Sequence, residues 1–270
     1  MLAKLLKYEF KATARYFLPL YLAMLVVAVI CRLLYSFDVA LLYSFDVAME
    51  YLPTLISTLV LFAIIVATFV LSFILTIKRF HTSLLTDEGY LMMTLPVSVH
   101  QHIWSKAIAA AVWITGSFLV TCLAMLIMFA TADAWTQLMS VIEETQLMIS
   151  SEYGFHAIIW VLMLVILLTI DIFQKLNSVY MCIAVGSQGA KHKLLLGIGA
   201  FVVYMIVIEI IGTIFGHIFS AIGLFDWYSA LAVNAQIYLG IIVLLVVDTA
   251  MFVLVYFVTT YILKNRLNLE

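Results

Sequence analysis

The sequence predicts an all-α membrane protein with six transmembrane helices, and three observations carry this prediction. Of the 270 residues, 66% are hydrophobic and only 10% are charged, whereas soluble proteins have about 45–50% and about 25%. Several apolar runs reach the roughly 20 residues that a membrane span requires. The basic residues gather between alternate runs, as they do on the inner side of membrane proteins. The composition excludes a cytosolic enzyme, and the net charge of −2 provides no basic footprint for nucleic acid.

We expect a single transmembrane domain over residues 1–270. Two of its features lie outside the spans. In 1–16, leucines and Phe10 recur at helical spacing among basic residues, which predicts a helix in the inner membrane interface; the alternative is an ordinary basic flank of the first span. In 131–155, apolar residues alternate with acids and predict a short helix on the outer surface. The six predicted spans are 17–35, 53–77, 106–130, 156–178, 194–218 and 234–263.

The distribution of Lys and Arg predicts the orientation of the chain. With both termini in the cytosol, 11 of the 13 basic residues fall on the inner side, and only Arg32 and Lys175 lie in spans. The expected outer loops then contain acidic residues but no basic ones. We therefore expect a multi-pass protein of the cell membrane with both termini in the cytosol. An exact octapeptide duplication, Leu33–Ala40 followed by Leu41–Ala48, lies in the first outer loop, and we assign it no function.

Ionisable residues inside the predicted spans are candidate functional groups, because they are costly at membrane depth. Asp171 and Lys175 stand one helical turn apart in the fourth span, which predicts an ion pair or a substrate-path role. Glu209 in the fifth span and Asp248 in the sixth have no base nearby in the sequence. They are expected to be protonated or to pair across helices, with a proton relay as the sharper alternative.

Other residue types indicate no chemistry of their own. The three cysteines, Cys31, Cys122 and Cys182, lie in apolar runs, and their spacing matches neither a disulfide framework nor a zinc site. We expect no catalytic site and no metal site. A G-x-x-x-G pair, Gly212 and Gly216, permits close helix approach either within the chain or across a dimer.

The most informative polar segment lies between the second and third spans, at Lys78–Lys106. Asp87 and Glu88 precede Gly89 and Tyr90 there. Pro96 interrupts any helix, and Ser98 with a Gln three residues later fits a capping box. The pattern predicts a short helix at the membrane edge that offers acids and an aromatic ring to a partner. The alternative is a loop that packs on its own bundle.

This segment resembles the corresponding loop of type-2 ABC (ATP-binding cassette) exporter permeases of clostridia-like Gram-positive bacteria. The resemblance implies a coupling helix, at Asp87, Glu88, Gly89 and Tyr90 before Pro96, that docks on a separate ATPase subunit. It also implies a smaller second contact at Lys191, His192 and Lys193. The matching motifs are Lys7-Tyr8-Glu9-Phe10-Lys11, Arg79-Phe80, Asp87-Glu88-Gly89-Tyr90-Leu91, Thr94-Leu95-Pro96-Val97-Ser98, Ser105-Lys106 and Tyr180…Gly186-Ser187-Gln188…Lys191-His192-Lys193.

The resemblance also implies the partners and the energy source. The chain contains no G-x-x-x-x-G-K-[ST] phosphate loop, so ATP and Mg are expected on the partner ATPase rather than on this chain. A second permease copy or a paralogue is expected to complete the membrane core, surrounded by lipid. The expected function is export of an amphipathic peptide or lipid. The alternatives are a membrane sensor or scaffold that binds an ATPase without transport, and a proton-coupled secondary transporter.

Overall fold

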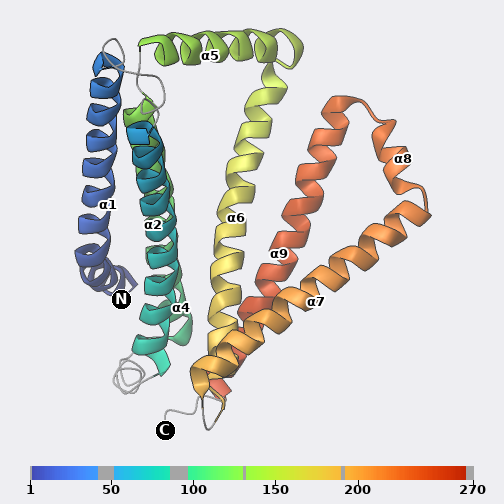
Figure 1. Ribbon diagram of the computed structural model, residues 1–270. Helices are drawn as coiled ribbons and strands as arrows, with labels where there is room; N and C mark the ends of the chain where they lie inside the picture. Colours follow the sequence, from blue (N-terminus) through green and yellow to red (C-terminus); the bar gives the residue numbers. More distant parts are fainter. Residues whose placement is uncertain (1, 42–51, 86–96, 130–131, 190–191, 266–270) are drawn as a thin grey trace. The chain divides into compact units, whose positions relative to one another are not determined.

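The computed structural model describes residues 2–41, 52–85, 97–129, 132–189 and 192–265, and every regular element within them is a helix (Figure 1). The predicted all-α class is therefore confirmed. The helices are α1 (Leu2–Leu41), α2 (Leu52–Leu85), α4 (Val99–Phe129), α5 (Ala132–Glu152), α6 (Phe155–Gly186), α7 (Lys193–Ala221), α8 (Leu224–Ser229) and α9 (Val233–Asn265).

Six of these helices, α1, α2, α4, α6, α7 and α9, are long and apolar enough to cross a membrane, and each contains one predicted span. Several helices run beyond the predicted apolar segments. The fourth continues from residue 178 to Gly186, and the third begins at Val99 rather than at 106. Hydrogen bonding within a helix continues past the membrane edge until a breaker intervenes, so hydropathy alone makes these helices too short.

The chain divides into two compact units, and each unit consists of two separate stretches of the sequence. The N-terminal unit comprises Met1–Lys78 and Trp104–Glu143. The C-terminal unit comprises Arg79–Ile103 and Glu144–Glu270. The boundary falls inside helices α2 and α4, so the segment between them belongs with the later half of the chain.

The core of the N-terminal unit is made by α1, α2 and α4. Its buried apolar cluster contains Met24, Ala28, Leu61 and Ala124. A line of hydroxyl groups crosses between the helices beside this cluster. Tyr21 OH lies 2.8 Å from Ser117 Oγ, which lies 3.1 Å from Ser72 Oγ. Small residues that allow close approach, with hydroxyls that bond across the interface, are the usual means of packing helices in lipid.

Helix α1 joins the predicted interfacial segment 1–16 and the first span in one continuous helix. Pro19 lies inside it, where a proline favours a bend. The first turns, in the darkest blue of Figure 1, curve away from the axis of the remainder. Segment 1–16 also packs on α4, because Trp113 Nε1 donates to Thr13 Oγ1 at 2.7 Å. That this segment lies in the lipid interface stays a prediction.

The C-terminal unit is built on α6, which packs against both α7 and α9. The turn between α6 and α7 is tight: a Cβ on Gly186 would collide with the backbone of Gly197. The glycine-containing stretch after Cys182 is therefore a helix end and close turn. From this turn α7 and α9 diverge and are joined at their far ends by the short α8 (Figure 1). A helix is present within 131–155 as α5, and its location on the outer surface stays a prediction.

Candidate functional site

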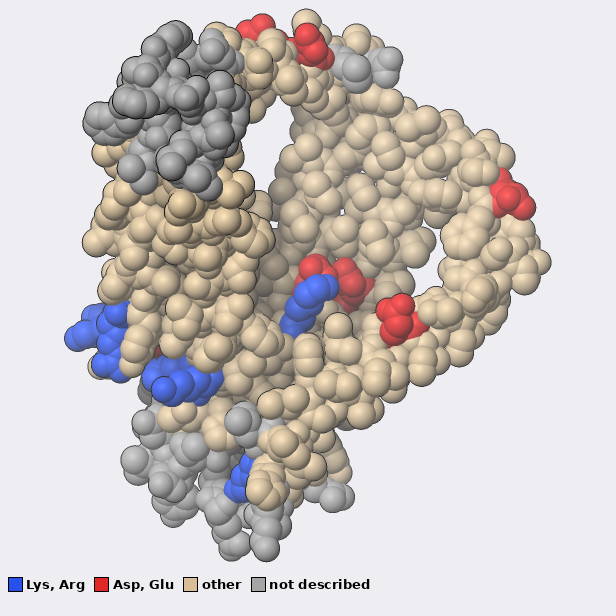
Figure 2. All heavy atoms as spheres, viewed as in Figure 1, with Lys and Arg blue, Asp and Glu red and all other residues tan. Residues whose placement is uncertain are grey.

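The four ionisable residues singled out as candidate functional groups in the spans all lie in the C-terminal unit, on α6, α7 and α9. Most of the surface in Figure 2 carries no charge, and acidic and basic atoms appear at a few separate places. We call Asp171 and Lys175 of α6, together with Asp248 of α9, the intramembrane charge cluster.

The predicted ion pair on α6 is present. Lys175 Nζ lies 2.6 Å from Asp171 Oδ1, and the two residues are four positions apart. The side chains are 70% and 31% exposed, so neither is enclosed by the described parts of the chain. A charge in the span of a membrane helix needs water, a protein partner or a route to the headgroups.

Asp248 of α9 extends this pair to a second helix. It lies within electrostatic range of both Asp171 and Lys175, so the base that the sequence did not offer comes from α6. When all three side chains are ionised, the cluster has two carboxylates, one ammonium and one net negative charge.

A neutral polar network lies on α6 beside the cluster and ties it to α7. Tyr204 OH of α7 is the common partner: Gln174 Nε2 donates to it at 3.1 Å, and Ser178 Oγ lies 3.0 Å from it. Ser178 Oγ also donates to the carbonyl of Gln174 at 2.9 Å. Hydrogen bonds between helices are worth about 0.6 kcal/mol each in membranes, so the network fixes the register of α6 against α7 more than it stabilises the fold.

Glu209 and the G-x-x-x-G pair have no comparable surroundings. Glu209 is exposed, and the hydrogen bond at this residue is from Thr213 Oγ1 to its backbone carbonyl at 2.8 Å. A Cβ placed on Gly212 or Gly216 would meet no described atom within 4 Å. Whether these glycines pack within the chain or across a dimer stays a prediction.

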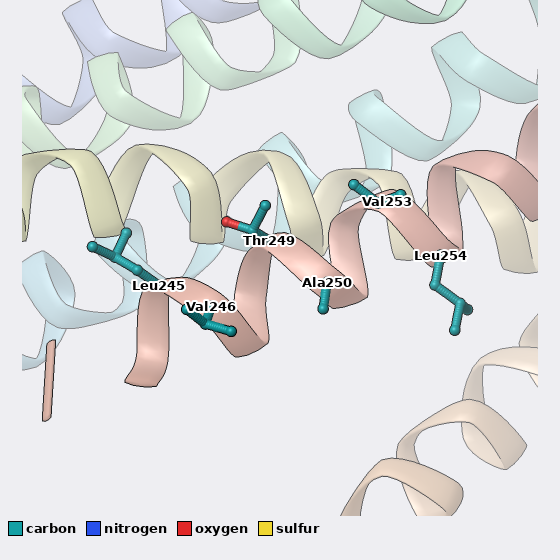
Figure 3. A pocket seen from close by; sticks show the side chains of 6 residues that line it. All are labelled: Leu245, Val246, Thr249, Ala250, Val253 and Leu254. Carbon is teal, nitrogen blue, oxygen red and sulfur yellow. The ribbon is translucent and has the colours of Figure 1, made fainter. Parts of the chain in front are cut away.

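Six residues on one side of α9 form a shallow, open and mostly apolar surface (Figure 3). At 100° per residue, the centre of this surface lies on the other side of α9 from Asp248. The surface and the charge cluster are therefore separate features. The residues are Leu245, Val246, Thr249, Ala250, Val253 and Leu254.

The segment expected to couple to an ATPase is anchored at both ends in the C-terminal unit. At the end of α2, Phe80 stacks on Tyr180 of α6 with ring centres 4.0 Å apart and planes 7° apart, and both side chains are buried. At the start of α4, His100 Nδ1 lies 2.6 Å from Tyr256 OH of α9. We call these contacts the two joints. They connect the segment to the two helices that carry the charge cluster.

The predicted docking residues themselves mostly lie outside the described residues. This applies to Asp87, Glu88, Gly89, Tyr90, Pro96 and Lys191. His192 is exposed and precedes α7 in a left-handed conformation, with φ of 57°, and Lys193 is the first residue of α7. The predicted cap at Ser98 is confirmed, because the backbone N–H of Gln101 donates to Ser98 Oγ at 3.4 Å.

A second ion pair, which the sequence did not indicate, lies in the N-terminal unit. Lys106 Nζ of α4 lies 2.6 Å from Glu9 Oε1 of α1, and the side chains are only 3% and 5% exposed. Both residues belong to the motifs that carry the family resemblance. Because 97 positions separate them, no periodicity could have paired them. The two joints were missed for the same reason.

Comparison with known proteins adds no relative: no family model, no curated protein and no solved structure matches this chain. The functional argument therefore depends on the residues described above.

Proposed function

We propose that this chain is the membrane-spanning permease subunit of an ABC exporter, driven by ATP hydrolysis on a separate subunit. The two joints carry this proposal. They attach the segment between α2 and α4 to α6 and α9, the helices that hold the intramembrane charge cluster. A partner that pulls or presses on this segment would therefore act on charged groups inside the membrane rather than on a loop that is free at its ends.

The distances along the helices favour direct transmission. Tyr180 follows Lys175 by five residues, which is about 7.5 Å of helix rise, and Tyr256 follows Asp248 by eight residues, or about 12 Å. Both joints are aromatic contacts between side chains of long helices, and the one between Phe80 and Tyr180 is buried. A displacement of the segment by an ATPase would thus move those parts of α6 and α9 that lie close to the cluster. In this proposal α6 and α9, the fourth and sixth spans, respond first.

The exposure of the cluster supports a transport path rather than a purely structural role. Asp171 and Lys175 are accessible to a passing molecule, and the remaining surface of α6, α7 and α9 is largely apolar. This combination suits an amphipathic cargo, a peptide or a lipid, whose charged part meets the cluster while its apolar part meets the helices. A second copy or a paralogue would form the opposite wall. The setting is the cell membrane, with both termini in the cytosol.

One observation favours a second candidate function. Asp248 lies within electrostatic range of Asp171 and Lys175. Proton-coupled transporters also use acidic and basic residues of this kind inside the membrane. A protein of that kind would move cargo under a pH gradient without any ATPase. A scaffold that binds an ATPase would, in contrast, retain the partner and move no cargo.

Isolation of the tagged chain from its native membranes in mild detergent tests the main proposal. We expect an ATPase with a phosphate loop to co-elute, and the substitution Glu88→Lys to remove it. Glu144→Lys on α5, with the same charge change on the opposite side, is the matched control and should retain the ATPase. If Glu88→Lys retained the partner with unchanged ATPase activity, the docking assignment would be wrong. If the wild-type chain retrieved no ATPase but transported under a pH gradient, the second function would replace the first.

Reconstitution with the ATPase then separates an exporter from a scaffold. The purified complex, in sealed vesicles, should move a fluorescent amphipathic peptide or lipid only when ATP is present on the ATPase side. ATP hydrolysis that no cargo candidate stimulates, together with unchanged cargo distribution, would identify a scaffold.

A further inference from the structure

Helix α5 is long but does not belong to the six helices that can cross a membrane. Its 21 residues give a length of about 31 Å, yet its composition is too polar for a span. It follows α4, which ends at Phe129, and precedes α6, which begins at Phe155. Because both neighbours are candidate spans, α5 is held at the level where they leave the membrane.

The apolar residues of α5 lie mainly on one side of the helix. At 100° per residue, four of them fall within about 60° of one another, and Val141 lies next to them. All five are exposed, with Val141 at 57% and Trp135 at 52%. The four residues that share this side are Trp135, Leu138, Ile142 and Ile149. Leu147 is also apolar, but it lies on the other side of the helix.

The opposite side of α5 is polar, and its charges are all negative. Glu143 and Glu144 lie there with Gln137 and several hydroxyl side chains, whereas Gln146 lies beside Trp135 on the apolar side. Ser140 Oγ donates to the carbonyl of Gln137 at 2.8 Å, and Ser150 Oγ donates to that of Leu147 at 3.0 Å. The helix contains no Lys or Arg, so it has no group that would attract an anionic lipid headgroup.

We propose that α5 is a lipid-binding helix that lies in the membrane interface on the expected outer side. Its apolar side enters the boundary between headgroups and acyl chains, where tryptophan is favoured. Its acidic side faces water. The position between two spans supports lipid as the occupant, because the bilayer is the apolar medium at that level. The absence of basic residues favours zwitterionic over anionic lipid.

Fluorescent labelling tests this proposal on the whole chain in lipid vesicles. Single cysteines replace Leu138 and Ile142 on the apolar side, and Ser140 and Glu144 on the polar side as matched controls. The background carries alanine at Cys31, Cys122 and Cys182. Each cysteine carries an environment-sensitive dye and is exposed to aqueous iodide and to lipids with a spin label on the acyl chain. The vesicles contain phosphatidylcholine alone or with phosphatidylglycerol.

We expect the dyes at Leu138→Cys and Ile142→Cys to be quenched by the labelled lipid and several-fold less by iodide than the dyes at Ser140→Cys and Glu144→Cys. Added phosphatidylglycerol should leave this lipid quenching unchanged or reduce it. Equal iodide quenching at all four positions would overturn the proposal. Protection of the apolar positions from both quenchers would also overturn it, because protein would then cover this side. Stronger lipid quenching with phosphatidylglycerol would contradict the preference for zwitterionic lipid.

Discussion

The two units each contain an ion pair of the same length in opposite surroundings. In the N-terminal unit, Glu9 and Lys106 are enclosed and join α1 to α4. In the C-terminal unit, Asp171 and Lys175 are exposed and lie within α6 alone. Both pairs measure 2.6 Å. Equal geometry therefore does not imply an equal role, because the energy of an ion pair depends on what surrounds it.

The difference indicates that the contact between α1 and α4 in the N-terminal unit is the harder of the two to break. A buried pair between two helices is costly to break, since each charge would remain in an apolar interior. It fixes the N-terminal segment to the first turns of α4, just after the predicted coupling segment. The exposed pair costs little to break where water reaches it. If the proposed function holds, these charges are accessible to the cargo.

Removal of the buried lysine should have the largest effect. Lys106→Ala leaves the Glu9 carboxylate enclosed without this cation, so we expect a loss of about 3–5 kcal/mol in the free energy of unfolding. Unfolding titrations in mixed detergent micelles measure it. Lys175→Ala is the control and should cost less than about 1 kcal/mol. Similar losses for both variants would remove the contrast between the units.

The joint at Tyr180 should rank second. Tyr180→Leu keeps an apolar side chain but loses the stack on Phe80, which should cost about 1–2 kcal/mol. If the proposed function holds, cargo-stimulated ATP hydrolysis should fall while the ATPase still co-elutes. Phe17→Leu, which loses a stack on Trp113 in the N-terminal unit, is the matched control and should keep the stimulation. Loss of stimulation in both variants would show a general packing defect.

Replacement of both members of the buried pair should restore most of the lost stability. Glu9→Gln with Lys106→Met removes both charges at similar volume, so we expect unfolding within about 1 kcal/mol of the wild type. The same titrations measure this value beside that of Lys106→Ala. A double variant no more stable than the single one would mean that the pair is needed for folding itself.

The exposed pair should show the smallest coupling. A double-mutant cycle with Asp171→Asn and Lys175→Gln should yield about 0.3–0.5 kcal/mol if water reaches α6 at this point. Thermal unfolding of the four proteins supplies the values. Coupling well above about 1 kcal/mol would place lipid rather than water around the pair and would argue against a transport path there.

The contrast between the pairs also explains how much of the site could be predicted. Asp171 and Lys175 are one turn apart on one helix, and Ser98 caps the helix that begins at the next residue, so local spacing was sufficient for both. Asp248 was recognised as an intramembrane acid, but its neighbours on α6 were not. Glu9 with Lys106, and Phe80 with Tyr180, lie about 100 positions apart, and residue spacing carries no signal for such contacts.

Hydropathy and charge placement alone established an all-α chain with six helices suited to a membrane, because the cost of burying polar backbone and charge in lipid acts on each segment separately. Tertiary structure decided that the segment between α2 and α4 belongs with α6 and α9, and that one lysine is enclosed while another is exposed. Those outcomes depend on which helices pack together, and packing depends on side-chain shape and burial across distant parts of the chain, which no local pattern records.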